Sequence, residues 1–564
     1  MEALDWLVIG VFFLALIGII VWVVRQKQND SADYFLGGRD ATWLAIGASI
    51  FASNIGSEHL IGLAGAGASS GMAMAHWEIQ GWMILILGWV FVPFNSRSMV
   101  YTMPEFLERR YNPQSRTILS VISLVSYVLT KVAVTVYAGG LVFQQVFGIK
   151  ELWGIDFFWI AAIGLVVLTA LYTIFGGMKS VLYTSVLQTP ILLLGSLIIL
   201  VLGFKELGGW DEMMRVCGAV TVNDYGDTMT NLIRSNDDAN FPWLGALIGS
   251  AIIGFWYWCT DQFIVQRVLS GKNEKEARRG TIFGAYLKLL PVFLFLIPGM
   301  IAFALHQKYI GAGGEGFLPM LANGTANADA AFPTLVAKLL PAGVKGLVVC
   351  GILAALMSSL ASLFNSSAML FTIDFYKRFR PETPEKKLVG IGQIATVVIV
   401  ILGILWIPIM RSVGDVLYTY LQDVQSVLAP GIAAAFLLGI CWKRTSAQGG
   451  MWGLIAGMII GLTRLGAKVY YSNAGEVADS TFKYLFYDMN WLFFCGWMFL
   501  FCIIVVIVVS LATEAPTAEK IQGLVFGTAT KEQKAATRAS WDHWDIIHTV
   551  IILAITGAFY WYFW

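Results

Sequence analysis

Apolar runs long enough to cross a lipid bilayer recur along the whole chain. A transmembrane helix needs about 20 predominantly apolar residues, and runs of this length alternate here with shorter polar segments. The pattern predicts an all-α integral membrane protein with about fourteen helices. The expected spans are residues 4–24, 43–67, 77–95, 117–147, 156–174, 180–203, 243–266, 281–305, 334–372, 388–410, 414–441, 447–470, 489–512 and 543–563.

Composition supports this class of protein. Of the 564 residues, 57% are hydrophobic and 13% are charged, whereas soluble domains carry roughly 25% charged residues. The apolar composition makes membrane lipid the expected surroundings. The net charge of +1 gives no basic excess, so no nucleic-acid partner is expected. The first apolar run lacks a basic leader and a small-residue cleavage site, which predicts a retained helix rather than a signal peptide.

The distribution of Lys and Arg over alternate loops predicts the orientation. One set of loops holds 24 of these residues and the other holds 10, and three lie within predicted spans. Because cytoplasmic loops carry the excess of Lys and Arg, the richer set is expected inside the cell. Both termini are then extracellular or periplasmic, in a multi-pass protein of the plasma or inner cell membrane.

The second expected span contains a polar stretch that a simple membrane helix does not need. It reads Ala52-Ser-Asn-Ile-Gly-Ser-Glu-His59. Asn and Gly are poor helix formers, and Glu58 and His59 would be costly against lipid. Irregular backbone at membrane depth occurs where it lines a cavity. The stretch therefore predicts an interrupted helix whose carbonyl groups coordinate a cation, and a helix-packing face is the alternative.

The ninth expected span carries a stripe of hydroxyl groups. Ser358, Ser362 and Ser366 fall on one helix face, with Ser359 beside them. Uncharged oxygen ligands suit a weakly held, exchangeable alkali cation, by analogy with other hard cations. Such a stripe alone is more often a contact between helices. Together with the interrupted second helix, it predicts a two-sided oxygen cage.

Several spans supply aromatic and hydrogen-bonding groups that suit a polyhydroxylated ring. Such a ring stacks its C–H face on aromatic side chains and pairs its hydroxyls with donors and acceptors. An ion pair between Lys288 and Glu78 with a purely structural role is an equal alternative. The candidate residues are Tyr257 and Trp258 in the seventh span, Lys288 in the eighth, Glu78 in the third, and Gln422 and Gln425 in the eleventh.

Four sequence motifs, in this order along the chain, resemble those of the sodium/glucose cotransporter family, which is part of the sodium/solute symporter family. They are the segment from Ala52 to Gly65, Tyr101-Thr-Met-Pro-Glu-Phe-Leu, the segment from Trp256 to Arg267, and the segment from Leu356 to Ser366. The resemblance covers about residues 30–445, and the fourteen-helix plan extends it to the end of the chain.

The resemblance implies a LeuT-type core of two inverted five-helix repeats around a site at mid-membrane. The repeats would occupy residues 43–203 and 243–441. Residues 1–30 would form an extra N-terminal helix, and residues 447–564 would form C-terminal helices with a cytoplasmic segment at 513–541.

The resemblance also implies roles for individual residues. A sodium site would use backbone oxygens of Ala52, Ile55 and Ala355 with the hydroxyls of Ser358 and Ser359. The sugar site would use Asn54, His59, Glu78, Lys288 and Gln422. Tyr257 would stack beneath the ring as the inner gate, with Trp258 beside it, and Leu63, Trp77 and Tyr418 would form the outer gate.

This chain departs from the family pattern at a few positions. Where some members hold a second sodium ion, it has Ser185 and Ala361 in place of a carboxylate and a hydroxyl, which favours one sodium ion per solute. Gly254 and Gln425 stand where some relatives carry Thr, so glucose itself is in doubt. The Ser-Glu-His form of the second span resembles the inositol-carrying branch.

The sequence therefore predicts a secondary active transporter that couples inward Na⁺ movement to uptake of a glucose- or galactose-like monosaccharide by alternating access. A symporter of myo-inositol or another polyol is the alternative from the same class. A sodium-dependent sugar sensor or channel is the alternative from another class. An enzyme using Glu58, His59 and Glu78 would leave the serine cage unexplained, so we expect no enzyme and no organic cofactor beside the transported Na⁺.

Overall fold

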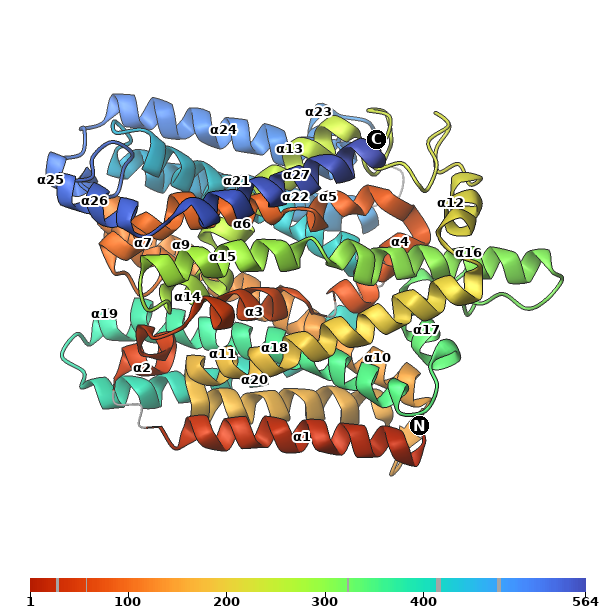
Figure 1. Ribbon diagram of the computed structural model, residues 1–564. Coiled ribbons are helices and arrows are strands. Elements are labelled where there is room, and N and C mark those ends of the chain that lie inside the picture. The colour runs from red at the N-terminus through yellow and green to blue at the C-terminus, as the bar shows by residue number, and fades with distance from the viewer. Residues whose placement is uncertain (27–29, 57, 322–323, 412–416, 474–477) are drawn as a thin grey trace.

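The computed structural model describes residues 1–26, 30–56, 58–321, 324–411, 417–473 and 478–564. The chain forms a bundle of helices that run mainly along one common direction, and both termini lie toward the same end of it (Figure 1). In the described residues, eleven segments are long and apolar enough to span a membrane. The all-α membrane class is confirmed, and the number of fourteen stays a prediction.

The first half of the chain builds these elements: α1 (Ala3–Val24), α2 (Ser31–Leu36), η1 (Gly37–Arg39), α3 (Trp43–Asn54), η2 (Glu58–Leu63), α4 (Ala64–Ser70), η3 (Gly71–Met74), α5 (Ala75–Glu78), α6 (Gly81–Ile86), η4 (Leu87–Phe91), α7 (Val92–Ser98), α8 (Met103–Arg110), α9 (Pro113–Ser126), η5 (Tyr127–Val132), α10 (Ala133–Phe147), β1 (Glu151–Leu152), β2 (Ile155–Asp156), α11 (Phe157–Leu207), α12 (Trp210–Gly218), α13 (Trp243–Gly254), η6 (Phe255–Thr260) and α14 (Gln262–Leu269). Strands β1 and β2 pair antiparallel.

The second half builds the rest: α15 (Glu274–Lys288), η7 (Val292–Leu296), α16 (Ile297–Gly311), η8 (Ala328–Ala330), α17 (Ala331–Leu339), α18 (Val344–Met369), η9 (Leu370–Tyr376), α19 (Lys377–Phe379), α20 (Glu385–Arg411), α21 (Leu417–Cys441), α22 (Ala447–Asn473), α23 (Thr481–Lys483), η10 (Tyr484–Asp488), α24 (Trp491–Ala512), α25 (Ala518–Ile521), α26 (Lys531–Ala539) and α27 (His543–Tyr562).

The fifth and sixth expected spans form one long element, α11, with a sharp turn at Gly177. The backbone there has φ +54°, a conformation that glycine adopts without the steric cost of a Cβ. A side chain at this position would also meet the backbone of Tyr34. The turn separates two helices, as the sequence predicts.

The predicted interruption of the second span is confirmed. Helix α3 ends at Asn54, and Ile55 is extended (φ −78°, ψ 105°). The π-helical segment η2 then leads into α4. The seventh span breaks in a similar way at Asp261 (φ −75°, ψ 126°), whose side chain accepts a hydrogen bond from the first turn of α14. The first span of each expected repeat is thus a broken helix.

Two further interruptions were not predicted. The third span breaks at Ile79 and Gln80, between α5 and α6. The eighth breaks after Lys288, where Pro291, which has no backbone N–H to donate, precedes η7. The eighth span is therefore divided into two halves, α15 and α16, as the second span is divided into α3 and α4.

The halves of these two spans pack in pairs through glycines. Gly47 of α3 lies against Gly280 of α15, while Gly299 of α16 lies against the Ala64 carbonyl of α4. Small residues let membrane helices approach closely enough for backbone contact. The bundle thus contains an α3–α15 pair and an α4–α16 pair on either side of the interruptions.

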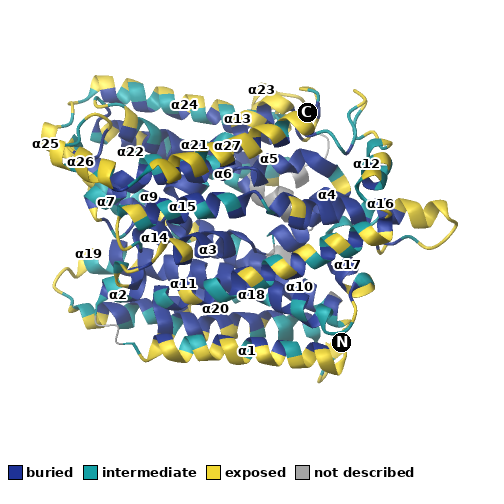
Figure 2. Cartoon of the chain, in the orientation of Figure 1, coloured by how far each residue is buried: buried dark blue, intermediate teal, exposed yellow. Residues whose placement is uncertain are grey.

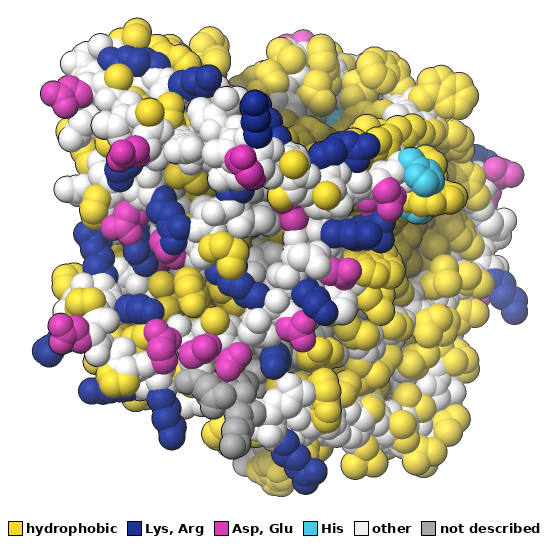
Figure 3. All heavy atoms as spheres, turned by 60° about the vertical axis from the view of Figure 1, so that its left-hand side comes forward, with side chains coloured by type: hydrophobic (Ala, Val, Ile, Leu, Met, Phe, Trp, Pro, Cys, Tyr) yellow, Lys and Arg dark blue, Asp and Glu magenta, His cyan; other side chains and the backbone are white. Residues whose placement is uncertain are grey.

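The outer surface is apolar where lipid would lie. Figure 2 shows α3, α15 and α18 largely buried, whereas α1, α24 and α27 expose much of their outer faces. The exposed side chains there are large and hydrophobic, such as Leu14, Ile504 and Val550. In Figure 3 the end of the bundle near α2, α7, α19 and α26 carries many Lys and Arg side chains, and a hydrophobic flank adjoins it.

Gly299→Ala should destabilise the protein, because the added methyl group would collide with the Ala64 carbonyl across the α4–α16 contact. Overpacking of this kind costs about 1–3 kcal/mol. The thermal unfolding midpoint of the purified protein would measure the loss. Gly311→Ala is the matched control, because it ends the same helix and has nothing within 4 Å of the added methyl. Equal midpoints for the two variants would contradict the tight contact.

Candidate functional site

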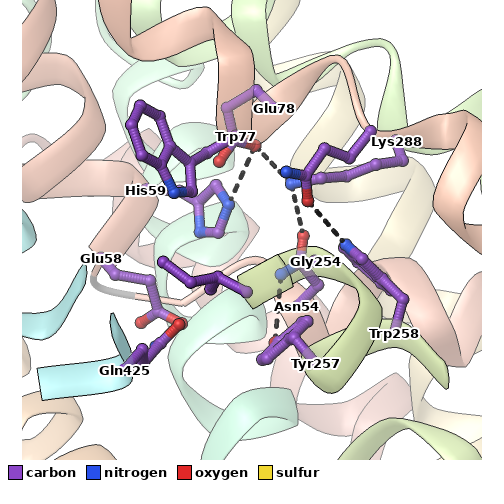
Figure 4. Close-up of a pocket in the computed structure, with 12 residues that line it drawn as sticks. Asn54, Glu58, His59, Trp77, Glu78, Gly254, Tyr257, Trp258, Lys288 and Gln425 are labelled. Atoms are coloured by element: carbon purple, nitrogen blue, oxygen red, sulfur yellow. Dashed lines mark hydrogen bonds and ion pairs between the residues drawn. The ribbon is translucent and has the colours of Figure 1, made fainter. Parts of the chain in front are cut away.

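A polar cavity lies where the interrupted helices meet. Its labelled side chains point inward in Figure 4. Asn54 ends α3, His59 lies in η2, Glu78 ends α5, Tyr257 lies in η6 and Lys288 ends α15. Its lining also includes Glu58, Trp77, Gln80, Ile253, Gly254, Trp258 and Gln425. The lining groups thus come mainly from positions at which α-helical hydrogen bonding stops or changes.

An ion pair stands at the centre of this cavity. Lys288 Nζ lies 2.5 Å from Glu78 Oε2, and the two side chains are 3% and 2% exposed. The same ammonium donates to Asn54 Oδ1 at 3.1 Å, and His59 Nε2 lies 3.2 Å from Glu78 Oε2. Four candidate residues from three expected spans therefore form one network (Figure 4).

The aromatic candidates close one side of the network. The Asn54 amide donates to the hydroxyl of Tyr257 at 3.1 Å, and the Tyr257 ring meets that of Trp258 edge to face at 4.9 Å. Lys288 Nζ lies 5.3 Å from the centre of a Trp258 ring. Tyr257 is thus held with its ring next to the polar groups, as expected for a stacking residue.

Gln80 is a lining residue that the sequence did not reveal. Its side chain accepts from Trp258 Nε1 at 3.3 Å and donates to the Ser250 carbonyl at 2.9 Å. A methyl group placed on Gly254 would come within 2.6 Å of Gln80 Oε1. Gly254 therefore leaves the space that Gln80 fills.

The expected outer-gate residues Leu63 and Trp77 are both buried. Trp77 stacks on Trp491 at 5.4 Å and meets the edge of Phe241. Gln425 lines the cavity. The side chains of Tyr418 and Gln422 lie outside the described part of the structure, so their roles stay predictions.

A second ion pair lies beyond Tyr257 and was also missed. Lys131 Nζ is 2.7 Å from Asp261 Oδ2, and the Tyr127 hydroxyl donates to the same carboxylate. The ammonium also lies 4.7 Å from the ring centre of Tyr257. An intramembrane Lys is a signal for a functional or paired group, and Asp261 is its partner.

The expected sodium ligands lie in α18 and at the C-terminal end of α3, two helices that pack against each other. Ser53 Oγ and Ser362 Oγ lie 2.6 Å apart and join these helices. A methyl group on Gly56 would lie 3.1 Å from Ser359 Oγ. Ala52, Ile55, Ala355 and Ser358 are all buried. Serine hydroxyls and the carbonyls of a broken helix are donors suited to a hard monovalent cation.

Ser185 lies beside this group. Its hydroxyl is 3.3 Å from Ser358 Oγ and donates to the Val181 carbonyl at 2.6 Å. It therefore adds a neutral oxygen next to the hydroxyl of Ser358.

The chain is similar to known proteins in both sequence and fold. A sequence model of the sodium:solute symporter family matches residues 34–457. Sodium/myo-inositol cotransporter 2 of Mus musculus is 37% identical over 94% of this chain and 80% of its own length. Sodium/glucose cotransporter 4 of Danio rerio is 35% identical over 96% of this chain and 84% of its own length.

Among solved structures, that of a Na⁺-coupled sialic acid symporter in a substrate-bound, outward-open state has the same fold. Its TM-score is 0.73 at 22% identity, and the match covers 92% of this chain and 99% of that one. The expected LeuT-type fold is confirmed.

Lys288→Met should destabilise the protein, because it leaves the Glu78 carboxylate buried without its cation. Breaking such a pair costs about 3–5 kcal/mol, whereas replacing both charges costs much less. The double variant Lys288→Met with Glu78→Gln should therefore unfold at a higher temperature than Lys288→Met alone. Lys205→Met, at an exposed position, is the control. A double variant no more stable than the single would show that the pair contributes nothing.

Proposed function

The chain belongs to the sodium:solute symporter family, and from this premise we propose that it couples inward movement of Na⁺ to uptake of a polyhydroxylated six-membered ring. A monosaccharide of the glucose or galactose class is one candidate. The relatives named as sodium/myo-inositol cotransporters favour myo-inositol as the second. Sodium is the co-transported ion, and the proposal includes no organic cofactor and no catalytic step.

The observation that carries this proposal is the buried network of Lys288, Glu78 and Asn54 beside Tyr257. A ring with several hydroxyls needs an ammonium or amide donor and a carboxylate or amide acceptor within one small space. It also needs an apolar face on which to stack. Tyr257 and Trp258 offer that face next to the polar groups. His59 and Gln425 add further hydrogen-bonding groups to the same cavity, and Gln422 is proposed to join them.

Sodium binding at the α3–α18 contact supports the coupling. We assign the ion to the carbonyls of Ala52, Ile55 and Ala355 and to the hydroxyls of Ser358 and Ser359, with one ion per solute. Asn54, at the end of the broken α3, reaches the solute network, so an ion that orders this end also orders the solute site. The coupling is reciprocal by thermodynamic linkage. Inward movement of one charge adds about 2.3 kcal/mol per 100 mV of membrane potential.

In this proposal, gates on the two sides of the cavity produce alternating access. Leu63 and Trp77, with Tyr418, would close the outer side, and Tyr257 would close the inner side. The repeats at 43–203 and 243–441 would move relative to each other, with residues 1–30 and 447–564 outside them. The protein would lie in the cell membrane, surrounded by lipid, with both termini outside and segment 513–541 in the cytoplasm.

Uptake by proteoliposomes tests the function directly. With an inward sodium gradient, one member of a radiolabelled panel (glucose, galactose, mannose, xylose, myo-inositol) should accumulate above its external concentration. Accumulation should collapse when potassium replaces sodium. Accumulation of none of these compounds would refute the proposed solute class, and binding without accumulation would favour a sensor or channel.

Ser359→Ala should raise the sodium concentration needed for half-maximal uptake by about tenfold, because a neutral ligand oxygen of the ion is lost and a net hydrogen-bond-like contact is worth about 1 kcal/mol or more. Sodium-dependence curves of uptake would measure it. Ser367→Ala is the control on the same helix, since the buried Ser367 hydroxyl has no hydrogen-bond partner among the described residues. An unchanged sodium dependence in Ser359→Ala would place the ion elsewhere.

A further inference from the structure

Glu58 has no role in the sites assigned so far, yet it lies between the solute cavity and a second cavity. The second cavity is lined by residues that include Ser359, Lys131 and Thr135. Three residues line both spaces: Glu58, Tyr257 and Gln425. Among the described residues, Glu58 is the only charged group that the two cavities share. Figure 4 shows Glu58 and Gln425 close together, away from the Lys288 network.

Glu58 also lies next to the proposed sodium site. A methyl group on Gly56 would meet Glu58 Oε2 at 2.5 Å and Ser359 Oγ at 3.1 Å. The carboxylate and the hydroxyl thus flank the same backbone atom at the break of the second span. Glycine at 56 leaves the room in which both oxygens approach the break.

Each of the two nearby lysines already pairs with another carboxylate. Lys288 pairs with Glu78, and Lys131 pairs with Asp261. Arg267 lies against the Phe263 ring and lines neither cavity. His59 is directed at Glu78. In the described part of the chain no ion pair within 4 Å joins Glu58 to any of these groups. Lys131, which lines the second cavity with Glu58, is near enough to feel its charge.

We propose that Glu58 supplies the negative charge of the sodium site and transmits sodium occupancy to the solute pocket. This inference rests on the proposed function and deepens it. The carbonyl and serine oxygens assigned to the ion carry no formal charge. A carboxylate a few ångströms away attracts a cation strongly where the effective dielectric constant is low. A bound Na⁺ neutralises Glu58, and the shared lining residue Gln425 then meets a neutral rather than an anionic neighbour.

Glu58→Gln keeps the shape of the side chain and removes its charge. It should raise the half-saturating sodium concentration for uptake by on the order of tenfold or more, with a smaller change in the solute KM at saturating sodium. Glu58→Asp should restore much of the sodium affinity because the charge returns. Glu78→Gln, which alters the other carboxylate of the cavity, should give the reverse pattern, with the larger change in solute KM.

Sodium binding without solute provides a readout that does not depend on transport. The thermal midpoint of the purified protein should rise with sodium chloride relative to choline chloride, because an ion that binds only the folded state stabilises it. In Glu58→Gln this rise should require roughly tenfold more sodium.

Overlapping sodium curves for the wild type and a folded Glu58→Gln variant, in both uptake and stability, would overturn the role of Glu58 while leaving the symporter intact. A wild-type protein whose uptake and stability are both independent of sodium would overturn the proposed function, and this inference with it.

Discussion

The ion pair between Lys288 and Glu78 is the interaction on which the central cavity depends. Its two charges lie in the interior of the bundle, where an unpaired charge is costly. Each residue ends a helix, so the pair holds the broken third span against the broken eighth. Asn54 and His59 attach to it from the second span. The arrangement keeps polar groups together at a depth where the surrounding surface is apolar.

The sequence predicted the helical class and the break of the second span because those features are local. Asn54 and Gly56 are poor helix formers in an apolar run, and Glu58 would be costly against lipid. The breaks at Ile79 and after Lys288 were missed although each has a local signal. Gly81 follows the first break, and Pro291, which cannot donate a backbone hydrogen bond, follows the second. Both residues lie in apolar runs long enough to be assigned as single continuous spans.

For the site, residues to which the family resemblance gives a role could be predicted, and the contacts of residues without such a role could not. Asn54, Glu78, Tyr257 and Lys288 meet as expected. Nothing in the sequence joins Lys131 to Asp261, which are 130 positions apart. Gln80 escaped because its role depends on the space beside Gly254, which only the packed structure reveals. The contact of Ser185 with Ser358 likewise requires two helices in place.

The pairing of half-helices through glycine contacts has a mechanical consequence. The α3–α15 pair and the α4–α16 pair are each tied by contacts at backbone distance, and the links within each span are the short segments that contain Ile55 and Pro291. In the proposed alternating access, each pair would tilt as a rigid unit about a hinge level with the cavity. One side of the cavity would then open while the contact that closes the opposite side remains intact. A continuous helix would transmit the same tilt to both mouths at once.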